Sequence, residues 1–207
     1  MIHDIPGPAG RLEVLLDEPS AEPIHAAVVL AHPHPQYGGT MHTKGVYQAA
    51  KGLARIGCAV LRFNFRGAGT SEGTFDEGRG ETDDYRAALG FMHDRYPSAH
   101  LWAGGMSFGA WIAMTAGAAD PRVTTLLGIA VPIAGYDWEA VRTSSKPKFF
   151  IHGERDELCP LKDIREFYAR AEEPKELIVI DAADHLFDGK TSEVADAVQD
   201  LLGDWEH

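Results

Sequence analysis

Short apolar runs alternate along the chain with longer segments in which apolar residues recur every three or four positions. Residues 26–31 are apolar throughout, which is typical of a strand buried on both faces. Residues 43–56 have helical spacing and end at Gly57. The same pattern predicts strands at residues 11–16, 26–31, 59–63, 100–103, 123–130, 149–152 and 176–180, and helices at 43–56, 83–95, 108–118, 161–172 and 194–202.

This alternation of strands and helices indicates the fold class. It favours an α/β fold in which a mostly parallel sheet is flanked by helices on both faces. With 207 residues, no internal repeat and no linker-like stretch, residues 1–207 are expected to form a single domain. Ligands of such sheets bind at the carboxyl ends of the strands, so the loops after the strands are the places to look for chemistry.

Charge and composition exclude several classes of function. The chain has 19 basic and 31 acidic residues and a net charge of −12, which argues against a nucleic-acid partner and against an anionic membrane surface. Its 2 cysteines are too few for a disulfide scaffold. The chain begins without a signal-peptide pattern, and no apolar run approaches the roughly 20 residues of a membrane span. We therefore expect a cytoplasmic monomer or homodimer that acts on a small molecule.

The loop after the strand at residues 100–103 contains the pattern G-x-S-x-G, as Gly105-Met106-Ser107-Phe108-Gly109. A serine between a strand and the start of a helix projects above the sheet, and the helix N-terminus stabilises developing negative charge there. The flanking glycines let the backbone turn sharply. This context predicts that Ser107 is a nucleophile. The alternative is a glycine-rich turn in which the serine has no catalytic role.

Two later strand ends supply an acid and a base. Asp156 follows the strand at residues 149–152, and His185 follows the strand that ends at residue 180. The chain order Ser, Asp, His suits a triad in which Asp156 orients His185 and His185 deprotonates Ser107. The neighbouring polar residues are interpreted otherwise: Glu154 and Glu157 as loop charges, His152 as a packed or hydrogen-bonded histidine, Asp184 as a turn or surface residue, and His207 as a terminal residue.

Acyl chemistry on a serine also needs backbone N–H groups directed at the developing oxyanion. One donor is expected from Phe108, the residue after the nucleophile. The second is expected from the loop at residues 32–39, where two prolines lack an N–H group. The remaining N–H donors near the start of this loop belong to His34, Gln36 and Tyr37. His34 is the favoured one.

Other motifs are interpreted as structural. His32 and His34, with His42 nearby, lack the cysteine or acidic partners of a metal site, so no metal is predicted, and the acyl chemistry needs no cofactor. The glycine-containing loop at residues 64–73 does not open a helix directly, as a dinucleotide loop would. It is interpreted as a structural loop in which Arg66 holds strand ends. Cys58 and Cys159 are interpreted as packing residues.

Together these segments resemble the α/β-hydrolase superfamily, and more narrowly its small, lidless bacterial branch related to dienelactone hydrolase. The resemblance extends from residue 30 to residue 202. Dienelactone hydrolase has a cysteine nucleophile where this chain has Ser107, so the resemblance implies a serine esterase. The matching segments are residues 31–41, Asn64-Phe65-Arg66-Gly67 with Gly69 and Ser71, His152-Gly153-Glu154 with Asp156, and Asp184-His185.

The length of one connection bears on substrate access. Residues 131–147 hold at most a short helix around residues 138–142, so no cap domain fits between the flanking strands. An open site of this kind predicts a carboxylesterase-like serine hydrolase for small or medium acyl esters. A thioesterase, a peptidase, an acyl transferase or a non-catalytic binding module of the same fold is the alternative. The candidate apolar walls for the substrate are Tyr37, Met106, Phe108, Ile133 and Trp138.

Overall fold

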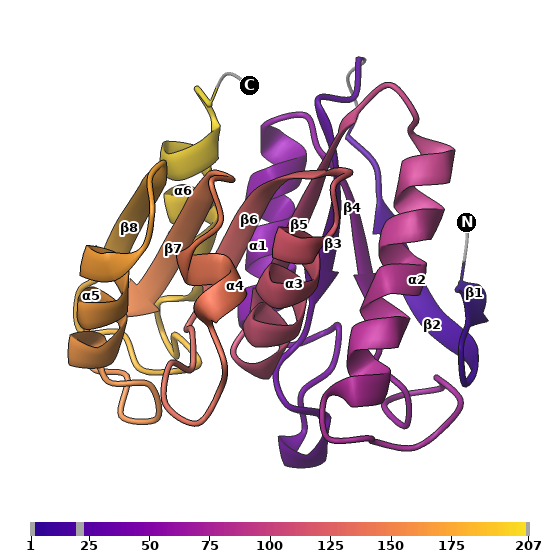
Figure 1. Cartoon of the computed structure of the whole chain (residues 1–207), viewed down its shortest axis with the longest axis horizontal. Coiled ribbons are helices and arrows are strands. Elements are labelled where there is room, and N and C mark those ends of the chain that lie inside the picture. Colours follow the sequence, from indigo (N-terminus) through magenta and orange to yellow (C-terminus); the bar gives the residue numbers. More distant parts are fainter. Residues whose placement is uncertain (1–2, 20–22, 206–207) are drawn as a thin grey trace.

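The computed structural model describes residues 3–19 and 23–205. Within them eight strands form one sheet in the order β1-β2-β4-β3-β5-β6-β7-β8 (Figure 1). Strand β2 runs antiparallel to both of its neighbours, and the pairs from β4 to β8 are parallel. The strands are β1 (Asp4–Gly7), β2 (Gly10–Asp17), β3 (Ala26–Ala31), β4 (Ala59–Phe63), β5 (His100–Met106), β6 (Val123–Ile129), β7 (Lys148–Gly153) and β8 (Lys175–Ile180).

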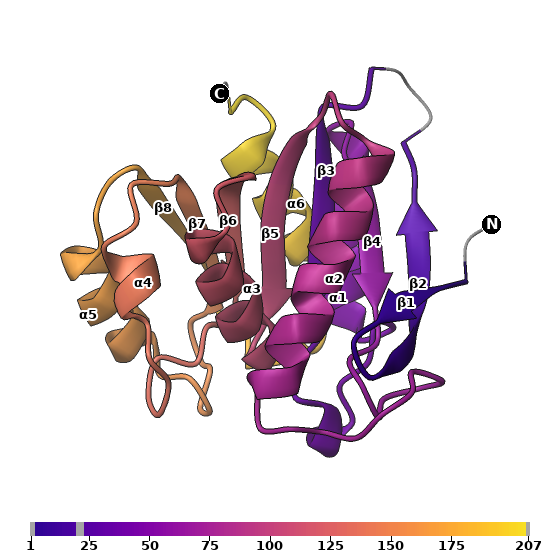
Figure 2. The same ribbon diagram turned by 45° about the vertical axis from the view of Figure 1, so that its right-hand side comes forward.

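Helices cover both faces of this sheet. Helices α1 and α6 pack against each other on one face, and α2 and α3 lie on the other, together with α4 and α5 (Figure 2). The helices are α1 (Lys44–Arg55), α2 (Arg79–Arg95), α3 (Phe108–Ala119), α4 (Glu139–Arg142), α5 (Leu161–Arg170) and α6 (Thr191–Leu202), and the short 3-10 helix η1 (Pro35–Tyr37) follows β3.

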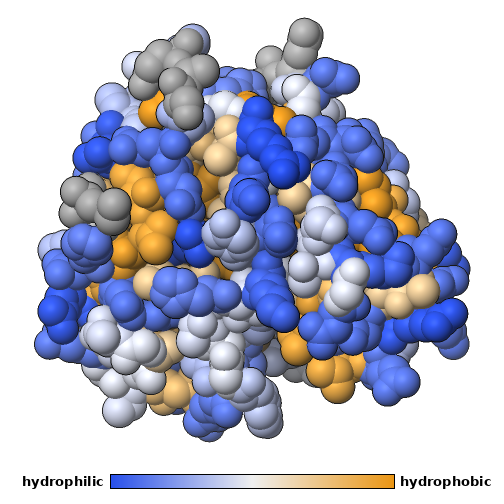
Figure 3. Space-filling model, turned by 180° about the vertical axis from the view of Figure 1, so that it is seen from behind, coloured by the Kyte–Doolittle hydropathy of each residue, from blue (hydrophilic) through white to orange (hydrophobic). Residues whose placement is uncertain are grey.

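Two hydrophobic cores, one on each face, explain the apolar runs in the sequence. All six residues of β3 are buried. Its odd-numbered side chains join the core under α2 and α3, and its even-numbered side chains join the core under α1 and α6. Seen from behind, on the side of α1 and α6, the outer surface is largely hydrophilic and its hydrophobic residues form small separate patches (Figure 3).

The predicted α/β sheet with helices on both faces is confirmed, and two of its details are corrected. The sequence pattern missed β1, which pairs with β2 in a short hairpin. Helix α2 begins at Arg79 rather than at residue 83. The reason is the turn before it, where Gly78 has φ 93° and donates its N–H to the fully buried carboxylate of Glu81 at 2.7 Å. A buried side-chain cap of this kind starts the helix one turn earlier.

The loop at residues 64–73 joins neighbouring elements through buried polar groups. The guanidinium of Arg66 donates to both carboxylate oxygens of Asp84 in α2, at 2.7 and 3.0 Å, and so holds the helix rather than strand ends. The side chain of Asn64 accepts from the N–H of Met41 at 2.8 Å and donates to Glu13 in β2 at 2.7 Å. This segment is therefore structural, as expected.

Residues 130–147, between β6 and β7, contain only the four-residue helix α4, so this connection forms no cap over the sheet. Among the described residues, no helix has the length and apolar character needed to cross a membrane.

Candidate active site

Ser107 stands at the turn between β5 and α3 in an uncommon backbone conformation, with φ 54° and ψ −125°. A non-glycine residue in such a region costs on the order of 1–3 kcal/mol. Three backbone hydrogen bonds hold it there. Its N–H donates to the carbonyl of Ile129 at 2.8 Å, and its carbonyl accepts from Ala110 at 2.8 Å and Trp111 at 3.2 Å. The side chain is thereby fixed at the end of the central strand.

The two glycines of the G-x-S-x-G pattern permit this turn because their backbone lies too close to neighbouring backbone for a side chain to fit. A Cβ on Gly105 would come closer than 3.0 Å to the backbone of Gly109. A Cβ on Gly109 would likewise collide with the carbonyl of His32 and the backbone of Ala31, at the end of β3. The first turn of α3 thus lies directly on the start of the loop at residues 32–39.

Ser107, His185 and Asp156 form one hydrogen-bonded row. Nε2 of His185 lies 2.9 Å from Oγ of Ser107, and Nδ1 of His185 lies 2.8 Å from Oδ2 of Asp156. The Asp156 side chain is fully buried, and the His185 side chain is 11% exposed. With the Nδ1–H donated to the carboxylate, Nε2 is the acceptor for the serine hydroxyl. A row of this kind can remove the serine proton and hold the imidazolium that results.

The loop after β7 directs Asp156 toward the imidazole. Its second carboxylate oxygen, Oδ1, accepts the N–H groups of Leu158 at 3.0 Å and Cys159 at 2.7 Å. His152 is fully buried and its Nε2 donates to the carbonyl of Cys159 at 2.6 Å. Burial lowers the pKa of His152, which favours the neutral ring. The interpretation of His152 as a hydrogen-bonded histidine is confirmed, but the sequence did not reveal that it fixes the acid loop.

The acid loop and the base loop are tied to each other. The N–H of Arg155 donates to the carbonyl of Ala183 at 2.8 Å. The N–H of Ala182 donates to the carboxylate of Glu154 at 2.8 Å, so Glu154 braces the base loop and does not orient His185. The positions of Asp156 and His185 are therefore set by one connected segment of backbone.

The loop after β3 brings its two histidines to different places. His32 is fully buried, with Nδ1 donating to the carbonyl of Pro33 at 2.6 Å and Nε2 accepting from Phe65 at 3.1 Å. Burial lowers its pKa to about 4, so the ring is neutral and both nitrogens are occupied. The ring of His34 instead packs on that of Phe108, with centroids 4.8 Å apart. The side chains of His34 and Phe108, the two residues predicted to supply N–H donors, are therefore in contact.

With this geometry established, comparison with known proteins identifies the family. A family described as an alpha/beta hydrolase domain matches residues 24–202. The chain belongs to the α/β-hydrolase family. The narrower resemblance to dienelactone hydrolase stays a prediction from the sequence.

Similar proteins agree with this membership. An uncharacterized protein of Rickettsia prowazekii is 38% identical over 95% of this chain and 86% of its own length. A solved structure from Coxiella burnetii, described as an alpha-beta serine hydrolase homologue, is 34% identical, covers 96% of this chain and 95% of its own, and has a TM-score of 0.90. Another, from Xanthomonas campestris, is described as an a/b serine hydrolase without lid; it is 34% identical over 95% and 90% of the two chains, with a TM-score of 0.86.

Burial argues against three of the five predicted substrate walls, because Met106, Phe108 and Trp138 are 0%, 3% and 5% exposed. Met106 is fully buried in the core under α1 and α6, because its side chain points to that face of the sheet. Trp138 is 5% exposed and donates its indole N–H to the carbonyl of Pro132 at 3.0 Å, so it belongs to the opposite core. Tyr37 is exposed and Ile133 is half-buried, and these two stay candidates.

The cysteines have the packing role that the sequence predicted. Cys58 and Cys159 are buried, and burial raises the pKa of each thiol to about 12. Among the described residues, one group could offer three metal ligands: Asp156, Cys159 and His185. The carboxylate of Asp156 and the imidazole of His185 already form a hydrogen bond with each other, and the thiol of Cys159 is protonated at neutral pH. Hydrogen bonding therefore accounts for the closeness of these three side chains without a metal. His207 lies outside the described residues.

A substitution at Gly109 tests the close packing beneath Ser107. Gly109→Ala is expected to lower the free energy of unfolding by about 1–3 kcal/mol, because backbone must move to admit the methyl group. Gly90→Ala is the matched control, since that position in α2 has open space and alanine raises stability by up to about 1 kcal/mol. Urea unfolding of both variants measures the difference. Equal stabilities for Gly109→Ala and the wild type would contradict this account of the turn.

The buried His32 predicts a pH dependence of stability. Its pKa is about 4 in the folded chain and near its ordinary 6.5 when unfolded, so between these values only the unfolded chain binds the proton. The free energy of unfolding should fall as the pH drops below 6.5. At about pH 5 the loss that comes from His32 is about 2 kcal/mol relative to neutral pH. Urea unfolding at about pH 7.5 and about pH 5 should show a smaller loss for His32→Asn than for the wild type. His42→Asn, at an exposed position, should keep the wild-type loss.

Proposed function

We propose that this α/β hydrolase is a serine hydrolase that cleaves small or medium acyl esters through an acyl-enzyme. The observation that carries the proposal is the row in which His185 lies 2.9 Å from the oxygen of Ser107 and 2.8 Å from Asp156. The strained, hydrogen-bonded turn at Ser107 supports it, because rigid placement of a nucleophile beside its base lowers the barrier to attack.

In this mechanism Ser107 Oγ attacks the ester carbonyl while its proton passes to Nε2 of His185. Asp156 stabilises the resulting imidazolium and keeps its tautomer. The N–H groups of Phe108 and His34 bind the tetrahedral oxyanion. When the C–O bond to the alcohol breaks, His185 returns the proton to the leaving oxygen. Water then attacks the acyl-enzyme while its proton passes to His185, and when the bond between the acyl carbon and Ser107 Oγ breaks, His185 returns that proton to Oγ, which releases a carboxylic acid and free Ser107.

The size of the acyl group follows from access to the site. No cap covers the carboxyl end of the sheet between β6 and β7, so an ester reaches Ser107 directly from solvent. Tyr37 and Ile133, which are exposed and half-buried, are the apolar surfaces proposed to contact the acyl chain. A shallow surface made of Tyr37 and Ile133 suits a small or medium acyl chain better than a long one, because a long chain needs a deep apolar pocket.

Removal of the serine hydroxyl is the central test. We expect Ser107→Ala to lower kcat for p-nitrophenyl acetate by at least about 1,000-fold, because the nucleophile is lost while the fold is kept. A fluorophosphonate probe should label the wild type at Ser107 and leave Ser107→Ala unlabelled. Ser192→Ala, an exposed serine at the start of α6, is the control and should behave as the wild type.

The same experiment separates this function from its alternatives. Equal turnover by the wild type and Ser107→Ala would contradict the assignment of Ser107 as the nucleophile. Folded wild type that resists the probe would contradict the proposal and indicate a binding module. Thioester and anilide analogues of the same acyl group distinguish a thioesterase or a peptidase from an esterase. A series of p-nitrophenyl esters from acetate to palmitate should give its highest kcat/KM at short or medium chains.

A further inference from the structure

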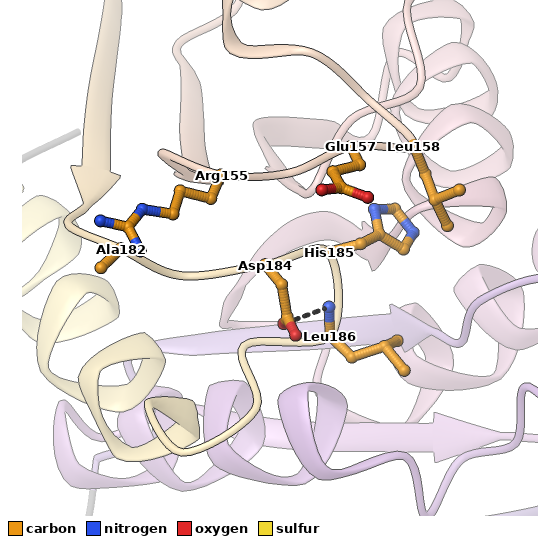
Figure 4. A pocket seen from close by; sticks show the side chains of 7 residues that line it. All are labelled: Arg155, Glu157, Leu158, Ala182, Asp184, His185 and Leu186. Atoms are coloured by element: carbon orange, nitrogen blue, oxygen red, sulfur yellow. Dashed lines mark hydrogen bonds between the residues drawn. The ribbon is translucent and has the colours of Figure 1, made fainter.

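An apolar groove opens beside His185. Among the described residues four large apolar side chains are exposed, and two of them, Leu158 at 75% and Leu186 at 47%, flank this groove. Exposed apolar side chains gathered at one place on a soluble protein mark a binding surface. The groove has a volume of about 500 Å³ and is lined by Arg155, Glu157, Leu158, Ala182, Asp184, His185 and Leu186 (Figure 4).

Both leucines are held outward by turns that depend on neighbouring aspartates. The N–H of Leu158 donates to Oδ1 of Asp156 at 3.0 Å. The N–H of Leu186 donates to Oδ1 of Asp184 at 3.1 Å, so Asp184 is the turn residue that the sequence predicted. Figure 4 draws this second bond and places the Leu158 side chain next to the His185 ring. The apolar edges of the groove are therefore preformed.

The groove begins at the proton donor of the proposed reaction. His185 must pass a proton from Nε2 to the leaving alcohol oxygen, so that oxygen lies within hydrogen-bond distance of the ring during acylation. His185 lines the groove and its Nε2 lies 2.9 Å from Oγ of Ser107, so this ring links the groove to the nucleophile. The alcohol part of an ester is thus the part of the substrate that leaves toward this groove.

The charges around the groove disfavour an anionic alcohol. Glu157 and Asp184 face it with carboxylates, and Arg155 provides the single lysine or arginine charge. The Arg155 guanidinium extends over Ala182, at the end of the groove away from the His185 ring (Figure 4). Beside the His185 ring lie the Leu158 side chain and the Glu157 carboxylate, and Leu186 lies farther along the groove (Figure 4), so an uncharged apolar chain is favoured there over an anionic one.

On these grounds we infer that the groove beside His185 binds the alcohol part of the substrate, and that this alcohol is an uncharged, apolar one of medium length. The inference rests on the proposed serine hydrolase function. It assigns Leu158 and Leu186 as specificity-determining residues for the leaving group, whereas Tyr37 and Ile133 face the acyl group.

A series of acetate esters tests the assignment, because all its members form the same acyl-enzyme. Differences among ethyl, butyl and hexyl acetate therefore come from acylation and appear in kcat/KM, while deacylation is common to all. We expect kcat/KM to rise about two- to fourfold for each methylene added to the alcohol. The acetate ester of 6-hydroxyhexanoate, which carries a terminal carboxylate, should be a poorer substrate than hexyl acetate.

Matched variants locate the effect. Leu158→Asn and Leu186→Asn should flatten the dependence on alcohol length, so that each lowers kcat/KM for hexyl acetate more than kcat/KM for ethyl acetate. Leu158→Met keeps an apolar chain and should keep the dependence. Tyr47→Asn, at an exposed position on α1 that does not line the groove, should also keep it.

The outcomes separate this inference from the function on which it rests. Ser107-dependent hydrolysis with no dependence on alcohol length in the wild type would overturn the groove assignment and leave the esterase standing. A dependence that survives in both asparagine variants would also overturn it. Absence of labelling and of hydrolysis for every ester would overturn the proposed function itself. Where one asparagine variant does not fold, the other still tests the groove, and a wild-type series without length dependence overturns the assignment by itself.

Discussion

The conformation of Ser107 is the constraint on which the site depends. At φ 54° the residue turns β5 into α3 without an intervening loop, and its N–H and carbonyl are both used to hold that turn. Such a turn is possible only where the helix can approach the sheet closely, which requires glycine on both sides of the serine. The strain is sustained by hydrogen bonds to β6 and to α3, so the elements around the nucleophile must all be in place before its oxygen is positioned.

The register of β7 and β8 positions Asp156 and His185, just as the turn after β5 positions Ser107. In the β7–β8 pair Gly153 lies opposite Ile180, so both strands end at the same level and their loops leave the sheet side by side. A Cβ on Gly153 would collide with the backbone of Ala183 and Asp184, which shows how closely the two loops pack. Asp156 and His185, 29 residues apart in sequence, are neighbours because of this register.

The sequence could predict whatever depends on strand ends and could not predict what depends on the direction of single side chains. Ser107, Asp156 and His185 each follow an apolar run, and the topology of a parallel sheet brings such positions together. Met106 was misplaced because a residue at the very end of a strand faces one core or the other according to the pleat, which its apolar character does not reveal. The early start of α2 depends on Glu81, whose buried carboxylate caps Gly78.

The sequence did not predict that Leu158 and Leu186 are exposed, because leucines are expected to be buried and no neighbouring pattern distinguishes these two. Their exposure follows from the aspartates beside them. Asp156 uses one carboxylate oxygen for His185 and the other for the backbone that presents Leu158. The orientation of the base and the shape of the groove are thus set by the same side chain. A change at Asp156 therefore alters proton transfer and leaving-group binding together, and its kinetic effect measures both rather than the orientation of His185 alone.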